Sequence, residues 1–254
     1  LGAVVISSYD KVVVPFFGKG LPIEYELTRS VQTVAQEKRH TLGILRTDAD
    51  LMSGSREWQI VTELKKQYDV EEVSPSSEID ADRFDVLLAV MPSSLTDSEM
   101  DNFVKYVKAG HPVMVFDDPF PLAFNSGFGV TNAPRQPKPR PGGHMGMFGG
   151  GGGPPPEQKA DGGRATRLLN ALNVEWQYDE VVFDVNNPHP EFGMLPPEYV
   201  FITRYGNNPE AFNADEPITR GLQEVIAIYS GTVRERTGGD RKVRFTKLLT
   251  TGAV

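Results

Sequence analysis

The sequence predicts an α/β fold in which helices cover a parallel sheet. Segments rich in β-branched residues alternate with amphipathic helical segments, an order typical of parallel sheets. Two strand-like segments, "DVLLAVMP" (85–92) and "VMVF" (113–116), are continuous apolar runs, as expected of strands buried on both faces. The 254 residues suffice for one large domain.

The first part of the chain contains five expected elements before residue 85. Apolar residues at helical spacing predict the helices, and short β-branched or apolar runs predict the strands. The first is a β-rich segment with a turn at Ser7–Asp10, "AVVISSYDKVVVPF" (3–16). A helix, "IEYELTRSVQTVAQEKR" (23–39), and a strand, "TLGILRTD" (41–48), follow it. The last two are a helix, "SREWQIVTELKKQY" (55–68), and a strand, "YDVEEVS" (68–74).

The clearest helical signal begins at Thr96. Thr96 and Glu99 form the pair of a capping box, and Gly110 stands where the helix is expected to end. Apolar residues between them recur at positions i, i+3, i+4 and i+7: Met100, Phe103, Val104 and Val107. The strand at 113–116 follows directly, which continues the alternation of helix and strand.

The composition divides the chain into three parts: residues 1–130 as the first part of the α/β domain, 131–163 as a flexible insertion rich in Gly and Pro, and 164–254 as the remainder with a β-rich extension. Five successive glycines in the insertion suggest a phosphate loop. Such a loop is usually followed by Lys-Ser or Lys-Thr and a helix, whereas Pro154–Pro156 follow here. We therefore expect a flexible loop.

The last part is predicted to hold one helix and four strands. The helix is "RATRLLNALNV" (164–174), with Asp161 as its N-terminal cap. We expect the last two strands to form a hairpin across the "TGGD" turn (237–240). The four strands are "DEVVFDV" (179–185), "EYVFITRYG" (198–206), "QEVIAIYSGTV" (223–233) and "KVRFTKLLTTG" (242–252).

Charge and composition exclude several classes of function. A net charge of −8 argues against binding of nucleic acid, which requires clustered Lys and Arg. The absence of Cys excludes disulfides, zinc–thiolate sites and Cys nucleophiles. No apolar run approaches the roughly 20 residues of a membrane-spanning helix. The chain runs from Leu1 to Val254 without an initiator Met, so we expect a soluble piece of a longer protein whose membrane anchors lie elsewhere.

Paired aspartates at predicted strand ends are the sharpest candidates for chemistry. Asp117 and Asp118 directly follow the strand at 113–116, and ligands of open α/β sheets bind beyond the carboxyl ends of the strands. Asp48 and Asp50 follow an earlier strand and would complete a metal site if the two strands were neighbours, because hard cations require six or more oxygen ligands. The alternative is structural: turns favour Asp, and Pro119 would close this one.

Other catalytic arrangements find little support. Asn125 and Ser126, in "FNSGFG", are candidates for contact with a ligand or partner, but the segment lacks the Gly-x-Ser-x-Gly elbow of a serine nucleophile. His40 and His111 each precede a strand, at the end opposite to the usual site. The sequence therefore predicts no catalytic residue, no metal site that it can specify and no cofactor.

The segment "DVLLAVMPSSLTDSEMDNFVKYVKAGHPVMVFDDP" (85–119) resembles the auxiliary component of ABC-type transport systems, in particular the gliding-motility-associated, GldG-like family. The resemblance extends over roughly Glu24 to Asp184, interrupted by the Gly/Pro-rich insertion. It rests on four features. The first two are a strand that ends near a Pro, Val86–Pro92, and the start of a helix that contains Leu-Thr and Glu, Leu95–Glu99. The other two are a turn from a Tyr to a Gly, Tyr106–Gly110, and a strand that ends in Asp118-Pro119. One departure is "RTDADLMSGSRE" (46–57), where the family often has a Gly-His-Gly-Glu turn.

The resemblance implies a non-enzymatic interaction or sensing domain. It implies a sheet like those of flavodoxins and class I glutamine amidotransferases, without the nucleophilic Cys that amidotransferases need. It also implies an ABC permease and ATPase as partners, and a position on the extracytoplasmic (periplasmic) side of the inner membrane, anchored by the full-length protein. Under this interpretation Asp118-Pro119 is a strand-ending turn. The alternative is a metal-dependent hydrolase or carbohydrate-binding domain that uses the aspartates at the strand ends.

Overall fold

A computed structural model describes most of the chain, and it divides the chain into two compact units. The first unit comprises residues 1–46, 50–89 and 111–114, and the second comprises 47–49, 90–110 and 115–254. The described residues are 2–17, 23–52, 57–121, 158–184, 189, 191, 193–204, 208–240 and 242–252.

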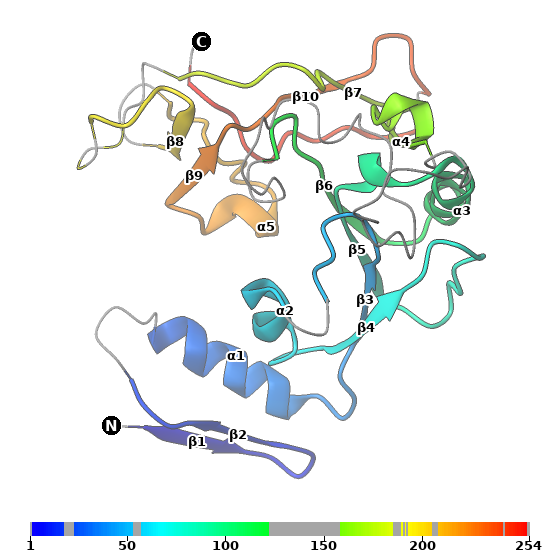
Figure 1. The fold of residues 1–254 in the computed structure, drawn as a ribbon. Coiled ribbons are helices and arrows are strands. Elements are labelled where there is room, and N and C mark those ends of the chain that lie inside the picture. The colour runs from blue at the N-terminus through cyan, green and yellow to red at the C-terminus, as the bar shows by residue number, and fades with distance from the viewer. Residues whose placement is uncertain are drawn as a thin grey trace, which may run out of the picture. The chain divides into compact units, whose positions relative to one another are not determined.

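A four-stranded parallel sheet confirms the predicted α/β class (Figure 1). The strand order is β4-β3-β5-β6, so β3 is central and pairs in parallel with both β4 and β5. All four strands lie in segments for which the sequence predicted strands: β3 (Thr41–Leu45), β4 (Asp69–Val73), β5 (Val86–Val90) and β6 (Val113–Phe116).

The first unit also contains an antiparallel hairpin and two helices. Strands β1 (Ala3–Ile6) and β2 (Lys11–Val14) form the hairpin, and the backbone N–H of Ser7 donates to the carbonyl of Asp10 at 3.0 Å to close its turn. Helix α1 (Ile23–Ala35) packs against this hairpin (Figure 1). Helix α2 (Gln59–Leu64) is shorter than the predicted 55–68, because the chain leaves helical geometry in turns after Leu64.

The buried face of α1 is more polar than its apolar spacing predicts. Ser30 and Thr33 are buried there, whereas Val31 is exposed. The hydroxyl of Ser30 donates to the carbonyl of Glu26 at 2.6 Å, and that of Thr33 to the carbonyl of Arg29 at 2.9 Å. These bonds within the helix satisfy the buried hydroxyls, so the face is buried without an unpaired polar group at either position.

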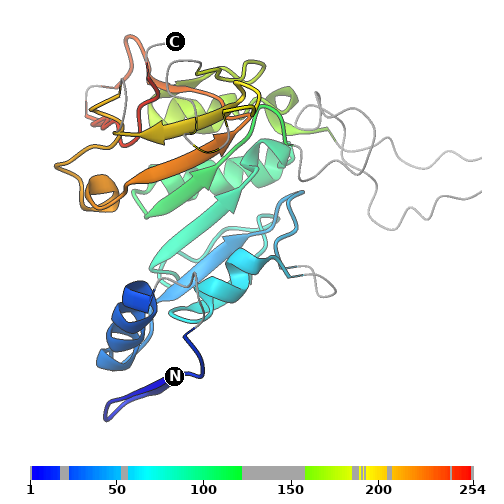
Figure 2. The same ribbon diagram turned by 90° about the vertical axis from the view of Figure 1, so that its left-hand side faces the viewer.

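Helices α3 and α4 of the second unit lie in segments predicted to be helical, whereas the short α5 (Pro217–Arg220) was not predicted. Helix α3 (Asp97–Lys108) begins with the expected capping box, in which the carboxylate of Glu99 accepts a bond from the N–H of Thr96 at 2.9 Å. The short helices η1 (Pro92–Ser94) and η4 (Ala160–Gly162) precede α3 and α4 (Thr166–Leu172). The N-cap of α4 is Ala165 rather than the predicted Asp161, although the Asp161 carboxylate accepts a bond from the N–H of Arg167, in the first turn, at 2.8 Å. Helices α3 and α4 lie side by side (Figures 1 and 2).

Strand pairing in the β-rich part differs from the prediction. Strand β8 (Tyr199–Thr203) pairs with β9 (Glu224–Ile228), and β7 (Val174–Trp176) pairs with β10 (Val233–Glu235), both antiparallel (Figure 2). The predicted hairpin across residues 237–240 is therefore wrong. Among the described residues of 242–252, β-pairing is limited to an isolated bridge between Leu249 and Phe212, so no strand forms there.

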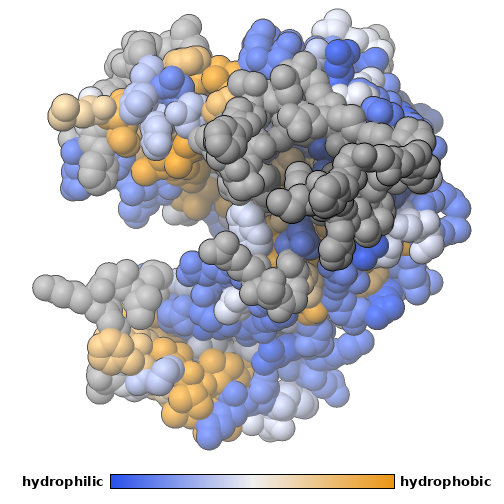
Figure 3. Space-filling view, viewed as in Figure 1, coloured by the Kyte–Doolittle hydropathy of each residue, from blue (hydrophilic) through white to orange (hydrophobic). Residues whose placement is uncertain are grey.

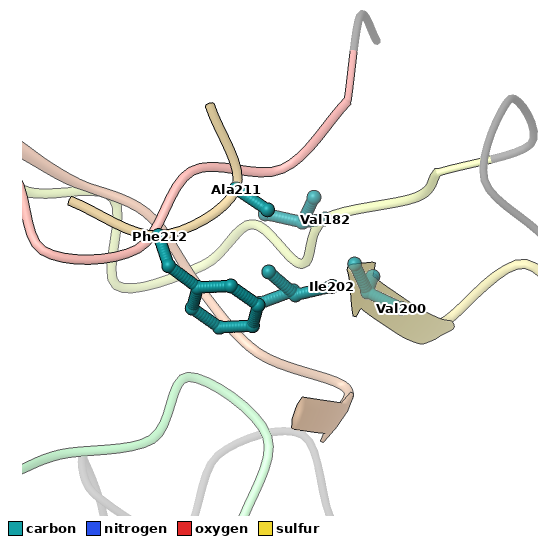
Figure 4. Packing of buried hydrophobic residues seen from close by; sticks show 5 residues of the cluster. All are labelled: Val182, Val200, Ile202, Ala211 and Phe212. Atoms are coloured by element: carbon teal, nitrogen blue, oxygen red, sulfur yellow. The ribbon is translucent and has the colours of Figure 1, made fainter. Parts of the chain in front are cut away.

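Residues 179–184 also form no strand, although their side chains alternate as a strand would. Val182 is buried and its N–H donates to the carbonyl of Ser230 at 2.8 Å, but no ladder develops around it. Its side chain instead completes a small core beneath β8 (Figure 4). The buried residues of this core are Val182, Val200, Ile202, Ala211 and Phe212. Two different contacts thus explain the alternation: Val182 packs in this core, and the buried Asp184 accepts a bond from the N–H of Gly252 at 2.9 Å.

Candidate functional site at the ends of the parallel strands

Asp117 stands at the carboxyl end of β6 and binds the turn that follows β5. The backbone N–H of Ser93 donates to its Oδ2 at 2.9 Å, and the Ser93 hydroxyl donates to its Oδ1 at 2.7 Å. The N–H of Asp118 donates to the same Oδ1 at 2.9 Å. Three donors from the chain itself therefore occupy this carboxylate.

Burial raises the pKa of Asp117 from 3.8 to about 6. The hydrogen bonds from Ser93 and from the backbone of Asp118 favour the charged form and oppose this rise, whereas the charge of the Asp118 carboxylate adds to it. Burial also raises the pKa of Asp118, and its own bond from the N–H of Phe120, at 2.8 Å, opposes that rise. The bond that the N–H of Phe120 donates to the Asp118 carboxylate encloses Pro119 in a short turn.

The turn that follows β5 contains a strained residue that the sequence analysis missed. Met91 has a left-handed backbone, with φ 55° and ψ 51°, and its N–H donates to the carbonyl of Phe116 at 2.7 Å. Strained residues at a sharp turn from strand to helix can carry a nucleophile. Here the side chain is a methionine that is only 2% exposed, so this turn presents no nucleophile. No local sequence signal marks a left-handed Met.

Asp48, at the end of β3, binds a lysine from far along the chain. Its Oδ2 lies 3.1 Å from Nζ of Lys159, whose side chain is 6% exposed. The N–H of Asp48 donates to the Ser94 hydroxyl at 2.9 Å, which ties the same residue to the turn after β5. Lys159 is a second residue that sequence reasoning missed, because it stands in the segment assigned to the Gly/Pro-rich insertion.

The end of that insertion belongs to the folded second unit. Lys159 forms a β-bridge with Thr96, and the N–H of Ala160 donates to the carbonyl of Leu95 at 2.8 Å. Lys159 and Ala160 are both buried. The ion pair with Asp48 is therefore held by backbone bonds on the lysine side. Residues 131–157 lie outside the described residues.

Of the other candidates, the structure describes only Asp50 and Asp118, and Asp50 is not part of this polar cluster. Asp50 belongs to the first unit, where it is exposed and has a φ of 45°. Asn125 and Ser126 lie outside the described residues. Within the described ranges, no three His, Cys, Asp or Glu side chains are grouped so that they could hold a metal ion.

The cluster has limited capacity for chemistry. Ser93 has a carboxylate partner, but it is completely buried and its hydroxyl proton is donated to Asp117. His40 lies at the start of β3, where its Nδ1 is 3.3 Å from Oδ1 of Asp85, and His189 accepts a bond from the N–H of Glu191 at 3.1 Å. Among the described residues of this α/β domain, the polar side chains at the strand ends thus bind one another, Asp117 to Ser93 and Asp48 to Lys159.

The chain belongs to a family described as "ABC-type uncharacterized transport system", whose family model matches residues 39–254. This confirms the predicted relation to auxiliary components of ABC transport and associates the protein with such a system. Neither a curated protein nor a solved structure matches the sequence. In the part of the chain that the structure describes, no helix is long and apolar enough to cross a membrane.

Proposed function

We propose that this chain is a non-catalytic, extracytoplasmic domain of an ABC transporter auxiliary subunit of the gliding-motility-associated, GldG-like type. The parent protein is anchored at the periplasmic face of the inner membrane and binds the permease and ATPase subunits. The domain acts as an interaction or sensing module through the surface at the carboxyl end of its parallel strands. Family membership over residues 39–254 is the observation that carries the proposal.

The state of the strand-end residues supports binding over catalysis. An enzyme of this architecture needs a reacting group that substrate can reach at the strand ends. Ser93 is completely buried, Asp117 accepts three bonds from the chain, and Met91 stands at the strained turn. These groups are engaged with one another and do not present a reactive group at the strand ends.

Affinity purification tests the assignment of partners. The full-length protein, tagged and expressed from its own locus, is recovered from gently solubilised native membranes, and its partners are identified by mass spectrometry. A protein with the tag alone is the control. We expect an ABC permease and ATPase in comparable amounts. A protein that is recovered soluble and alone contradicts the proposal.

The location of the domain needs a separate experiment. Protease added to intact spheroplasts reaches only extracytoplasmic segments, so we expect the tagged domain to be cleaved before lysis. A cytoplasmic protein and a known periplasmic protein are the controls. Cleavage only after lysis would place the domain in the cytoplasm and remove the extracytoplasmic part of the proposal, whatever the purification shows.

A further inference from the structure

The first unit contains a pocket of about 450 Å³ between the β1–β2 hairpin and α1. Its lining comes from β2 and the residues after it, from α1, and from Arg39 and Lys66. A volume of this size is in the range of small-molecule sites. All of these residues belong to one compact unit.

Positive charge is concentrated in this pocket. Four cationic side chains line it, together with one carboxylate, that of Glu26. The whole chain has a net charge of −8, so this excess of cations is local. The four cations are Lys11, Arg29, Arg39 and Lys66.

Arg29 is the most constrained of these cations. It is only 5% exposed, and its Nη2 lies 2.5 Å from Oε2 of Glu26. Its Nε is buried and has no hydrogen-bond partner among the described residues. A buried donor without an acceptor is costly and rare in folded proteins. Because Nε itself is closed to solvent, an anionic ligand would contact the part of the Arg29 side chain that lines the pocket.

Arg39 and Lys66 have partners that a ligand can replace. Arg39 Nη2 lies 2.7 Å from Asp10, and Lys66 Nζ lies 2.7 Å from Glu63, with about a third of each cationic side chain exposed. Exposed ion pairs contribute little free energy, typically about 1 kcal/mol or less. Both side chains therefore remain available to an anion in the pocket. An Arg fork suits the two oxygens of a carboxylate or phosphate.

The pocket is also lined by apolar residues, which follow the cation Lys11 along β2 and beyond it. They are Val12, Val13, Val14, Pro15 and Phe16, and the Phe16 side chain is 64% exposed. Figure 3 shows hydrophobic side chains gathered at the lower left of the molecule, where the hairpin and the start of α1 lie. The lining thus combines cationic and apolar side chains.

We propose that this pocket binds a small amphiphile, a molecule that joins a carboxylate or phosphate monoester to an apolar group. The anionic group contacts Arg29, Arg39 and Lys66, and the apolar group lies against Phe16 and the valines of β2. The site is independent of the proposed function. Most of its residues, from Lys11 to Arg29, precede residue 39, where the family match begins.

Two pairs of probes test the proposal with the whole chain. Octyl phosphate and octanoate carry both parts of the ligand and distinguish a phosphate from a carboxylate. Inorganic phosphate and 1-octanol each carry one part. Isothermal titration calorimetry and thermal unfolding are measured with all four, below the concentrations at which micelles form. We expect octyl phosphate or octanoate to bind at least about tenfold more tightly than either control probe. 1-Octanol lacks the charge-assisted contacts, each of which contributes about that factor, and inorganic phosphate lacks the alkyl chain, whose burial contributes a factor of about four, or about 0.8 kcal/mol, for each CH₂ group.

The chain offers a closely matched pair of double variants. Arg39→Gln with Lys66→Gln removes two cations of the pocket, whereas Lys38→Gln with Lys65→Gln removes the same charge from adjacent positions outside the lining. We expect binding at least about tenfold weaker in the first double variant and unchanged in the second. Phe16→Ser, at an exposed position, should also weaken binding of the alkyl probes.

Three outcomes would overturn the proposal. The first is no binding of octyl phosphate or octanoate to the unmodified chain. The second is equal loss of binding in both double variants, which would show a general effect of charge. The third is 1-octanol or inorganic phosphate binding as tightly as the amphiphiles. Circular dichroism and the melting temperature of each variant establish that it is folded, and none of these results bears on the membrane partners of the full-length protein.

Discussion

Ser93 and Asp117 are joined by two hydrogen bonds, in which the serine is the donor from both its backbone and its side chain, at 2.9 and 2.7 Å. The pair connects the turn after β5 to the residue that follows β6. A carboxylate that accepts from a backbone N–H and a hydroxyl of the same residue is held in one orientation. The pair therefore fixes the geometry of the strand-end edge in the second unit.

The raised pKa of Asp117 predicts a specific dependence of stability on pH. The folded state retains the proton up to a pH of about 6, whereas the unfolded chain loses it near 3.8. Stability from this group is therefore complete below 3.8 and is lost as the pH rises through about 6. The loss reaches at most about 3 kcal/mol, because each unit of pKa corresponds to roughly 1.4 kcal/mol.

Urea unfolding of the unmodified chain and of Asp117→Asn, at pH values across this window, measures the effect. As the pH rises, the unmodified chain should lose the free energy of unfolding that its protonated Asp117 contributes, whereas the variant, which has no titrating group at this position, should not. Asp215→Asn, at an exposed position in the same unit, should follow the unmodified chain at every pH. A difference that stays constant across the window would show that the pKa of Asp117 is not raised.

The Asp48–Lys159 pair predicts an asymmetric double-mutant cycle. Asp48→Asn removes the carboxylate that pairs with Lys159, a lysine whose side chain is 6% exposed. We therefore expect the free energy of unfolding to fall by about 1–3 kcal/mol. This loss is smaller than that for fully buried pairs, because the Asp48 carboxylate is partly exposed. Lys159→Met should lower the free energy of unfolding by less, because it removes the buried cation and leaves only the partly exposed Asp48 carboxylate. The two changes combined should cost less than their sum.

Asp50→Asn is the matched control for this cycle. Asp50 is exposed, and Asn tolerates its positive φ, so we expect a change of no more than about 0.5 kcal/mol. Chemical denaturation measures all four variants. Strict additivity of Asp48→Asn and Lys159→Met would contradict a direct interaction of the two charges.

Divalent cations should not stabilise the protein. A ligand that binds only the folded state raises the melting temperature, and Asp48 and Asp117 already bind Lys159 and Ser93. Thermal unfolding is measured with Mg²⁺, Ca²⁺ and Mn²⁺, for the unmodified chain and for the double variant Asp117→Ala with Asp118→Ala. A cation-dependent rise that the double variant abolishes would instead support the alternative of a metal-dependent enzyme.

Gly43, in the centre of β3, should not tolerate a side chain. A Cβ at this position would lie 2.8 Å from Leu87 Cδ1 and from Val73 Cγ2, and both residues are buried. We expect Gly43→Ala to lower the free energy of unfolding by about 1–3 kcal/mol through overpacking. Gly221→Ala is the control, because φ there is −90°. A Cβ at Gly221 would have no atom of the described residues within 4 Å, apart from those of its two chain neighbours. Equal urea midpoints for the two variants would refute the prediction.

Local signals predicted the parallel sheet and α3 well. The capping box of Thr96 and Glu99 acts within one turn of helix, and the apolar run of β5 reflects burial of that strand alone. The candidate site was predicted in part: Asp48 and Asp117 do lie at strand ends. Their partners, Lys159 and Ser93, were not predicted, because an ion pair or hydrogen bond between distant residues leaves no periodic signal in the sequence.

By itself the sequence determined the α/β class and the positions of the parallel strands, because periodicity, caps and apolar runs act over a few residues. The relation to the ABC transport family came from the resemblance of its motifs to that family. Only the tertiary structure decided which strands pair and what each aspartate binds. Strand β9 pairs with β8, although a turn sequence lies between β9 and residues 242–252. The reason is physical: a strand pairs where its apolar face is buried, and Val225 and Ala227 of β9 pack on the core of Val200 and Ile202 in β8.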